Sequence, residues 1–411
     1  MTSEVLTRPT TTERRARAAV AALFLTNGAL FANLVPRYPG IKADLGLSNT
    51  AYGLTVIAYP AAALLAGLAA ATLIRRFGSA RAAVTGTAVT AVGILLAGLS
   101  PSIAALVAAL LLAGAADAIT DVAQNAHGLR VQRRYGRSII NSFHAVWSIG
   151  AVIGGGMAAA AIALGVSRGV HLAVAGVVFA VVAVTALRFC LPGPDTREEV
   201  LPDGSAVPGD SPPGTTQLVR AVLTRRTAVV TAALVAIAIA GVLVEDAGST
   251  WAAVYLSGPL GAPAALAALG FVALVGAQTV GRLVGDRLVD RFGQRAVART
   301  GGLLAAVGMG VALAAPSVPG TIAGFAAAGL GVATLVPAAM HEADELPGLR
   351  PGTGLTLVSW LMRLGFLVSP PVVGLVADEV GLRAGLLVVP LAGLVAFGLA
   401  GALRTQRACS W

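Results

Sequence analysis

The sequence contains one short stretch twice, as Leu73-Ile74-Arg75-Arg76-Phe77-Gly78 and, 215 positions later, as Leu288-Val289-Asp290-Arg291-Phe292-Gly293. The same shift, without a gap, carries the following residues onto identical ones: Gly86 onto Gly301, Gly93 onto Gly308, Pro101 onto Pro316, Gly114 onto Gly329, and Gly150 onto Gly365. Half of the glycines between positions 73 and 155 fall on glycine in this way, although only 50 of the 411 residues are glycine. We infer an internal duplication, and such repeats build many membrane transporters.

The composition around these stretches is that of a chain solvated by lipid. Hydrophobic residues make up 56% of the chain and charged residues 12%, and the mean hydropathy is +0.83. Soluble domains are about 25% charged, so this chain has too few polar residues to cover a surface that faces water. Its apolar runs are long enough to span a bilayer and lack two-residue alternation, which indicates helices.

We predict twelve transmembrane helices, six in each half. They cover residues 18–37, 51–74, 82–99, 102–127, 139–164, 170–190, 227–247, 263–286, 297–315, 319–340, 355–377 and 382–403. The stretch 191–220 is polar and rich in Pro and Gly, so we interpret it as a cytoplasmic linker between bundles at 1–190 and 221–411. Because six is an even number, both halves enter the membrane from the same side and are parallel repeats. The predicted fold class is therefore an all-α membrane protein with two parallel six-helix repeats.

The basic residues indicate the orientation of the helices. If the N-terminus is cytoplasmic, only Arg37, Lys42, Arg168 and Arg383 face outside and Arg363 lies within a helix, while the rest of the 29 lie on cytoplasmic segments. The net charge of +10 is thus a topology signal, and we expect no nucleic-acid partner. Both termini are predicted to be cytoplasmic, and the Arg-, Ala- and Gly-rich, Lys-poor composition suggests a bacterial plasma membrane.

The second copy of the repeated stretch, extended through Gln294 to Arg295, resembles the loop signature of the major facilitator superfamily. The first copy is a degenerate version, with Arg75 where that family usually has Asp. The segments Asp121–Ala126 and Ser142–Gly150 are similar to the MosC-like branch, which is related to fucose permease. The resemblance implies the twelve-helix fold of that superfamily and transport of a small polar solute such as a sugar, a polyol or a related metabolite.

Two sets of loop residues are candidates for gates. The first comprises the repeated turns, with Arg76, Gly78, Asp290, Arg291, Gly293 and Arg295. Gly293 permits a sharp reversal, Asp290 can accept hydrogen bonds, and the arginines can bond the carbonyls at helix C-termini. The second set pairs Arg130 and Arg137 with Glu342 and Glu345 of the matching loop as a latch, in which each exposed pair is worth only about 0–1 kcal/mol. For both sets the alternative is that the charges only mark topology or are solvated.

The sharpest polar signal lies in the predicted helix 102–127. Asp117 and Asp121 are four residues apart and share one face, which Gln124 and Asn125 continue. An Asp at the centre of a span costs about 2.5–3.5 kcal/mol on insertion scales, so it faces a cavity or a partner. Because nearby carboxylates repel each other, one of them readily holds a proton. We predict Asp117 as the proton carrier; Asp121 either joins it or serves as a cap or a partner for a loop Arg.

Charged residues in other spans extend this candidate site. Glu245 and Asp246 lie near the outer end of an apolar run, before Gly248-Ser249-Thr250-Trp251, and are either ligands at an unwound segment or ordinary interfacial charges. Arg363, within the predicted helix 355–377, needs an acid, a carbonyl or an anionic ligand, and Asp117 or Asp121 across the cavity is a natural partner. The alternative for Arg363 is an Arg side chain that reaches toward the cytoplasm.

Uncharged polar residues complete the candidate set. His144 and Trp147 lie with Asn141 on one helix face, where His144 can relay protons and Trp147 can stack on a sugar or a cation. Asn27, Asn33 and Gln278 are candidate cavity residues. The alternative for all of these is packing, or an interhelical hydrogen bond worth about 0.6 kcal/mol. Gly150-x-x-x-Gly154 and Gly365-x-x-x-Ser369 are interpreted as helix-packing motifs.

Three function classes compete. Proton-coupled transport of a small polar solute by alternating access comes first, and drug or metabolite efflux second. Gly155-Gly156 lacks the Gly-Pro pair of the antiporter branch, which argues mildly against efflux. The third class is a non-transporting receptor or an intramembrane enzyme, which the scattered histidines disfavour. The chain has no Gly-Lys pair, so we expect no ATP site. We also expect no metal, no cofactor and no disulfide between Cys190 and Cys409, and a monomer in the bilayer.

Overall fold

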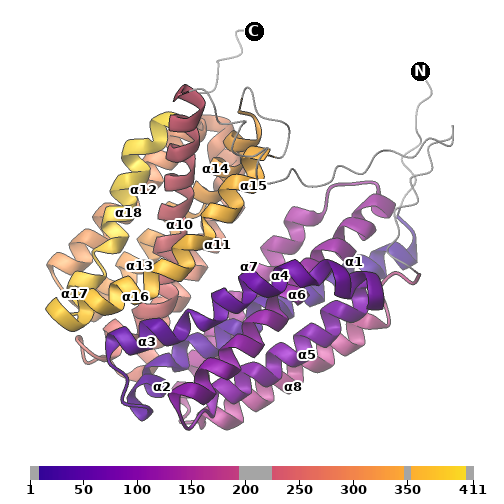
Figure 1. Cartoon of the computed structure of the whole chain (residues 1–411), viewed down its shortest axis with the longest axis horizontal. Coiled ribbons are helices and arrows are strands. Elements are labelled where there is room, and N and C mark those ends of the chain that lie inside the picture. The colour runs from indigo at the N-terminus through magenta and orange to yellow at the C-terminus, as the bar shows by residue number, and fades with distance from the viewer. Residues whose placement is uncertain (1–8, 194–224, 347–352, 404–411) are drawn as a thin grey trace.

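The computed structural model describes residues 9–193, 225–346 and 353–403, and these residues are helical almost throughout (Figure 1). Twelve helical spans in this described part are long and apolar enough to cross a membrane, so the predicted number of helices is confirmed. The linker predicted at 191–220 lies, from residue 194 onward, outside the described residues.

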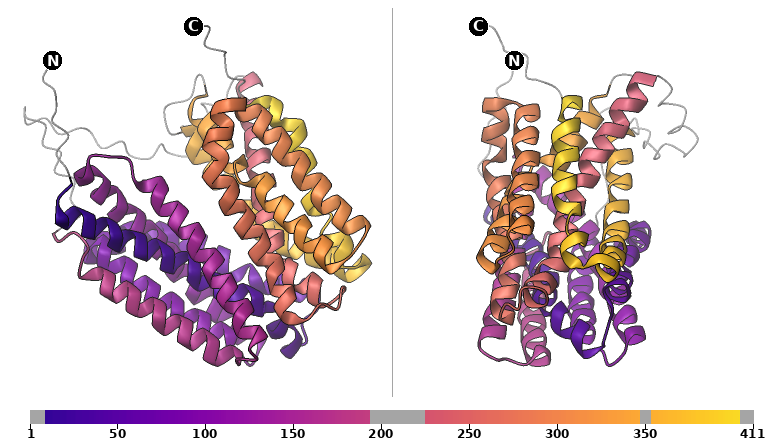
Figure 2. Two further views of the ribbon diagram at one scale, coloured as in Figure 1. Left: turned by 180° about the vertical axis from the view of Figure 1, so that it is seen from behind. Right: turned by 90° about the vertical axis from the view of Figure 1, so that its left-hand side faces the viewer.

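The first half is one bundle and the second half another (Figures 1 and 2). The first contains α1 (Thr11–Leu34), η1 (Val35–Arg37), α2 (Tyr38–Asp44), α3 (Asn49–Val56), α4 (Ala58–Phe77), α5 (Ser79–Gly98), α6 (Ile103–Tyr135), α7 (Ile140–Ala163) and α8 (Arg168–Leu187). The second contains α10 (Arg225–Ser257), α11 (Ala264–Phe292), α12 (Gln294–Ala314), α13 (Val318–Val332), α14 (Leu335–Asp344), α15 (Thr353–Leu361), α16 (Arg363–Val380), α17 (Leu382–Gly385), α18 (Val388–Leu399) and η2 (Ala400–Ala402).

The backbone repeats as the sequence does. Gly78 ends α4 and precedes α5 with φ 83° and ψ 149°, and Gly293 ends α11 and precedes α12 with φ 80° and ψ 152°. A positive φ of this kind favours glycine, which explains why both copies of the turn keep it. The close helix contacts repeat as well. A Cβ on Gly114 would overlap the carbonyl oxygen of Tyr59, and a Cβ on Gly329 would overlap that of Leu274, its counterpart under the same shift.

The interpretation of Gly150-x-x-x-Gly154 as a packing motif is also confirmed. A Cβ on Gly150 or Gly154 of α7 would overlap a backbone carbonyl of α1, and a Cβ on Gly28 of α1 would overlap one of α7. The two helices therefore touch backbone to backbone. Such contacts hold membrane helices together where no hydrophobic force acts between them.

Several predicted spans are interrupted in the structure, the second at Ile57, the tenth at Ala333 and Thr334, and the twelfth at Leu386 and Leu387. Two further differences involve candidate site residues. The seventh span does not end or unwind after Glu245 and Asp246, because α10 continues to Ser257. The residues beyond Thr250 are apolar and buried, with Trp251 and Leu256 fully enclosed, so the helix has a core to pack on. The eleventh span is interrupted at Met362, where the Gly365 N–H bonds the Met362 carbonyl only three residues back. Arg363 thus begins α16 and does not lie inside one continuous helix.

The halves join at one end of the bundles, which we call the outer seam because the predicted outside residues lie there. Both carboxylate oxygens of Asp378 in α16 accept backbone N–H groups of α3, from Asn49 at 2.9 Å and from Thr50 at 2.8 Å. At the same seam Gly53 of α3 abuts the Pro370 carbonyl. A carboxylate on a helix N-terminus is favourable, and here it ties one half to the other.

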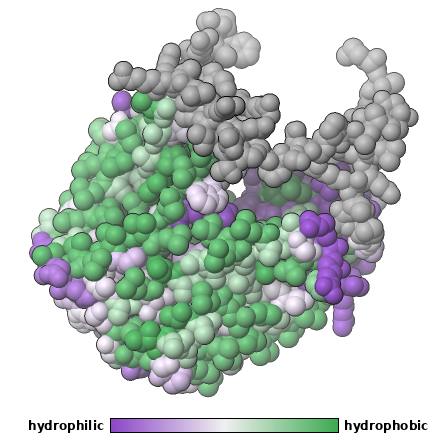
Figure 3. All heavy atoms as spheres, viewed as in Figure 1, coloured by the Kyte–Doolittle hydropathy of each residue, from purple (hydrophilic) through white to green (hydrophobic). Residues whose placement is uncertain are grey.

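The four basic residues predicted to face outside lie at this end and bond backbone carbonyls there. Arg37 bonds Val166 at 3.0 Å, Lys42 bonds Leu47 at 2.8 Å, Arg383 bonds Ala314 at 3.0 Å, and Arg168 bonds Gly98 and pairs with Asp44 at 2.9 Å. Toward the opposite end the two bundles diverge (Figure 2). The surface is hollowed between them, with hydrophilic residues in the hollow (Figure 3).

We predict that the repeated glycine contacts set the stability of each half. Gly114→Ala or Gly329→Ala forces α4 from α6, or α11 from α13, and costs about 1–3 kcal/mol, the usual range for overpacking. Thermal unfolding in detergent measures the effect as a lower melting temperature. Gly67→Ala is the control, because a Cβ there meets nothing within 4 Å. Equal melting temperatures for Gly114→Ala and Gly67→Ala would contradict this.

Candidate functional site

Asn27 is the centre of a polar cluster in the first half. Its side-chain nitrogen donates to Asp117 Oδ1 at 2.6 Å, and its side-chain oxygen accepts from Trp147 Nε1 at 2.8 Å. The indole N–H can only donate, so it defines which atom of the Asn27 amide is the oxygen and turns the nitrogen toward Asp117. Asn27 is buried and Asp117 is half-buried, although both lie in the middle of spanning helices. Three predicted site residues, from α1, α6 and α7, thus meet.

Gln124 links this cluster to the second acid of α6. Its side-chain nitrogen is 3.4 Å from Asn27 Oδ1 and 3.4 Å from Asp121 Oδ1, and Asn125 donates to Asp121 Oδ1 at 3.1 Å. Gln124 is fully buried, whereas Asp121 is exposed. An exposed acid on a helix of the bundle interior faces water, since lipid would reject it. The predicted face of four polar residues is therefore present, with Asp117 deeper and Asp121 in the hollow.

Tyr59 of α4 is a member of the cluster that the sequence analysis missed. Its ring is buried and its hydroxyl faces the Asp117 carboxyl, yet the hydroxyl has no hydrogen bond of good geometry. Phe31 packs on the Tyr59 ring with centroids 4.5 Å apart. A Tyr in an apolar run carries no polar pattern, so only the fold reveals that it stands next to Asp117.

Charged groups approach Asp121 from both halves. His144 of α7 and Arg363 of α16 are exposed and act electrostatically on the Asp121 carboxyl. Arg363 lies at a helix start, and its pairing with Asp117 or Asp121 stays a prediction.

A second cluster belongs mainly to the second half. Gln278 of α11 donates to Glu245 Oε2 at 2.7 Å, and Arg282 approaches the same oxygen at 3.4 Å. Arg282 also donates to Ser148 of α7 at 3.3 Å, so it bridges the halves. Arg282 lies inside the predicted span 263–286, so its assignment to the cytoplasmic residues was wrong. An Arg within a span was the signal that identified Arg363 and applied equally to Arg282.

Two predicted site residues, Asn33 and Asp246, lie outside these two clusters. Asn33 is buried near the outer end, where its oxygen is 2.8 Å from His171 Nε2 and its nitrogen donates to the Ala29 carbonyl at 2.8 Å. Arg37 donates to the other ring nitrogen of His171 at 3.3 Å, which places the ring hydrogen on Nε2. Asp246 is buried one position along α10 from Glu245, at the outer seam and away from the hollow.

The candidate gate residues make contacts within their own halves. Arg295, in the first turn of α12, donates to the carbonyls of Leu403 at 3.0 Å and Gly401 at 2.6 Å, at the C-terminal end of the last helical segment. Arg76 and Arg291 lie over the rings of Phe77 and Phe292, with distances of 5.4 and 5.3 Å to the centroids.

The residues of the predicted latch between the loops also bond locally. Arg130 donates to the carbonyls of Leu191, Pro192 and Gly193, which follow α8. Glu345 lies 3.8 Å from His341, and Glu342 is buried. Arg137 and Asp290 are exposed at the diverging ends of the bundles.

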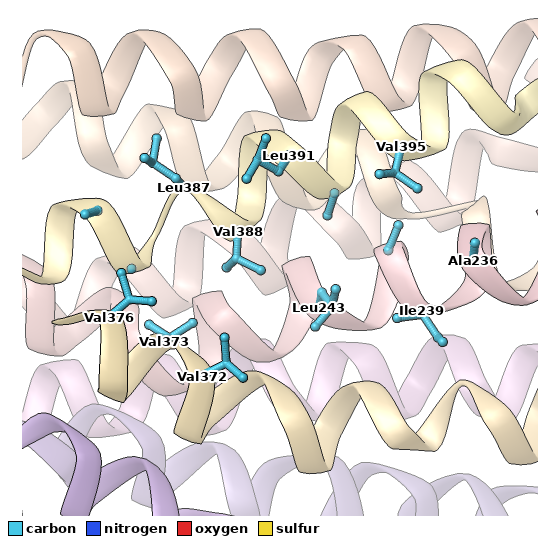
Figure 4. A pocket seen from close by; sticks show the side chains of 14 residues that line it. Ala236, Ile239, Leu243, Val372, Val373, Val376, Leu387, Val388, Leu391 and Val395 are labelled. Atoms are coloured by element: carbon cyan, nitrogen blue, oxygen red, sulfur yellow. The ribbon is translucent and has the colours of Figure 1, made fainter. Parts of the chain in front are cut away.

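An apolar cavity of about 600 Å³ lies in the second half between α10, α16, α17 and α18 (Figure 4). Its lining consists of Ala, Val, Ile, Leu and Gly, for example Leu243, Val373 and Leu391. Such a lining offers no side-chain hydrogen bond to a polar solute. The polar clusters around Asp117 and Glu245 are therefore the candidate site, and this cavity is not part of it.

One Ser-His pair occurs in the first half, but its hydrogen bonds do not suit catalysis. His127 Nδ1 is 2.8 Å from the Ser79 hydroxyl, and His127 Nε2 accepts the backbone N–H of Leu191 at 3.1 Å. The hydrogen of the ring is thus on Nδ1, which donates to Ser79 and cannot act as its base.

Comparison with known proteins agrees with this architecture. The sequence profile of the Major Facilitator Superfamily matches residues 20–287 and 246–408. An uncharacterized transporter of Sinorhizobium fredii, y4wD, is 29% identical over 92% of this chain and 95% of its own. The membrane protein MosC of Rhizobium meliloti is 39% identical over 37% of each chain.

Solved structures share the fold. The nucleoside transporter NupG superposes with a TM-score of 0.72 at 12% identity, over 96% of this chain and 99% of that one. A D-xylose–proton symporter superposes with a TM-score of 0.69 at 15% identity, over 95% and 98%. The duplicated bundles, the repeated turn and the profile match together show that this multi-pass membrane protein is a transporter of the major facilitator superfamily and not an enzyme.

Proposed function

We propose that the protein couples protons to the movement of a small polar solute by alternating access. The observation that carries this is the position of Asp117, a half-buried carboxyl in mid-span. Asn27 holds it on one side, the Tyr59 hydroxyl faces it, and Asp121 lies one turn away in the hollow. An acid at this depth is costly and marks a functional site, and proton relays are one of the known uses of such residues. The fold neighbour described as a D-xylose–proton symporter supports proton coupling.

The solute that fits is rich in hydroxyl or carbonyl groups. The first-half cluster offers amide and carboxyl groups with an indole beside them, and the second-half cluster offers Glu245, Gln278 and Arg282. These groups face the hollow from opposite sides, so one solute can contact both halves. Sugars, polyols and related metabolites have this chemistry, and the neighbours named for a nucleoside and for xylose carry hydroxylated cargo.

The two ends of the bundles are in different states, one closed and one open, and this difference supports alternating access. The outer seam is closed through Asp378 and α3, while the opposite end is hollow. We infer an orientation in the bacterial plasma membrane with both termini cytoplasmic, so the hollow opens inward. When the halves rock and that end closes, Arg130 and Arg137 approach the loop of Glu342 and Glu345, and the repeated turns around Gly78 and Gly293 meet the other half. A monomer suffices for this motion.

Uptake into proteoliposomes with an imposed pH gradient, screened against sugars, polyols, nucleosides and amines, tests the proposal. We expect a hydroxylated solute to accumulate and the accumulation to collapse with a protonophore. Accumulation of lipophilic amines alone would favour the efflux alternative, and uptake that ignores the pH gradient would contradict proton coupling.

Removing the proton carrier is expected to uncouple transport. With the solute from the screen, Asp117→Asn abolishes uptake driven by the pH gradient, because an amide cannot pick up a proton. Exchange of labelled for unlabelled solute persists, since it needs no net proton movement. Asp44→Asn, an acid-to-amide change at the outer end, is the control and retains driven uptake. Wild-type accumulation by Asp117→Asn would remove Asp117 from the mechanism.

The second-half cluster is expected to act as a unit. Arg282→Gln and Glu245→Gln each raise the KM by up to about fivefold, the equivalent of about 1 kcal/mol for a partly exposed pair. The double variant raises the KM no further than the worse single variant, because the pair is lost once. Initial rates of uptake measure this, and independent, multiplied effects would argue against a joint role.

A further inference from the structure

Asp246 lies beside an aromatic contact that closes the outer seam. Tyr38 of α2, Tyr52 of α3 and Trp251 of α10 are all at most 3% exposed, and their rings meet edge to face. The Tyr52 hydroxyl donates to the Thr250 carbonyl at 2.9 Å, which joins the first half to the second. Asp246 is one helical turn before Thr250 and is itself 8% exposed. A carboxyl group is thus enclosed at the place where the halves would separate.

The hydrogen bonds of Asp246 are incomplete. Its Oδ1 accepts only from the Thr250 hydroxyl, at 3.5 Å, and its buried Oδ2 has no partner. The Ser369 hydroxyl of α16 faces the same carboxyl, and its buried oxygen also lacks a partner. Buried polar atoms are almost always bonded, so two unpartnered ones that face each other need an explanation.

No positive charge compensates Asp246 within the described residues. The titratable groups that face it are Glu245 of α10, which repels it, and Tyr38 and Tyr52. The nearby cations are held elsewhere: Arg282 by Glu245 and Ser148, Lys42 by Leu47, Arg37 by His171 and Val166, and Arg383 by Ala314. A charged carboxylate in this enclosure has neither water nor a counter-ion.

A proton on Asp246 resolves the missing charge compensation, because it makes the carboxyl neutral. The Ser369 hydroxyl can bond Oδ2 in both states, as donor to the carboxylate or as acceptor from the protonated carboxyl. We propose that Asp246 is a second proton-binding site, in the second half, and that the outer seam closes only when Asp246 carries a proton. The site binds H⁺, supplied by the outer medium when the seam is open.

This site works separately from Asp117. Asp117 borders the hollow at the diverging end, whereas Asp246 is shut off behind Tyr52 and Trp251 and can meet water only when the seam opens. Loss of the proton leaves a charge that water must solvate, so it favours opening. Low pH therefore favours a closed seam and high pH an open one, whether or not Asp117 couples transport.

Distances between spin labels across the seam test the proposal. Spin labels are attached to cysteines that replace Leu164, at the outer end of α7, and Ala264, at the start of α11. Both positions are exposed and can be labelled, and the distance between them reports the separation of the halves at the seam. Cys190 and Cys409 are first replaced by Ser. In the labelled, reconstituted protein that keeps Asp246, at constant Na⁺, we expect the population with the short label-to-label distance to grow as the pH falls. Asp246→Asn should give the short distance at every pH, because its amide is permanently neutral.

Three further variants make the result specific. Ser369→Ala keeps the response but shifts it to higher pH, because the charged carboxylate loses a hydroxyl that donates to it. Asp44→Asn keeps the wild-type response, and Asp117→Asn retains a pH-dependent seam that Asp246→Asn loses, so failure of proton coupling at Asp117 and failure of this proposal are distinguishable. A wild-type distance that ignores pH, an Asp246→Asn protein that follows the wild-type titration, or closure that follows Na⁺ at fixed pH would each overturn it.

Discussion

The hydrogen bond between Asn27 and Asp117 is the interaction on which the polar interior depends. Hydrocarbon rejects an unsatisfied carboxyl, so an acid at mid-span persists only where partners or water receive it. Asn27 supplies the partner, Trp147 orients Asn27, and Gln124 extends the contact to the exposed Asp121. Asn27 and Gln124 are buried within the bundle, and Asp121 is the exposed member of the arrangement.

Close glycine contacts make each half a rigid unit in the proposed motion. Within each half, helices touch through glycines whose Cβ would strike a neighbouring backbone, as at Gly114 and Gly329, and such contacts do not deform gradually. Between the halves, polar links join Asp378 to the start of α3, Tyr52 to Thr250 and Arg282 to Ser148, beside close contacts such as that of Gly53 with the Pro370 carbonyl. In the proposed motion these are the contacts that change.

Much of the fold and of the candidate site could be predicted from the sequence, because these features depend on local sequence patterns. Composition and the 215-residue repeat predicted twelve helices in two halves, and the four-residue spacing predicted that Asp117 and Asp121 share a face. The continuity of α10 was missed, because buried packing beyond Thr250 outweighs the polar run before it. Tyr59 and Asp378 were missed because their roles arise from contacts between distant segments, as when Asp378 meets Asn49 from 329 positions away.

Proton-coupled transport as proposed requires that Asp117 gains and loses a proton inside the bundle. Infrared difference spectra of the reconstituted protein between mildly acidic and mildly alkaline pH measure this directly through the carboxyl C=O stretch, without knowledge of the solute. The account predicts a protonated-carboxyl band that disappears in Asp117→Asn and survives in Asp44→Asn. A spectrum in which Asp117→Asn and the wild type show the same bands would contradict it.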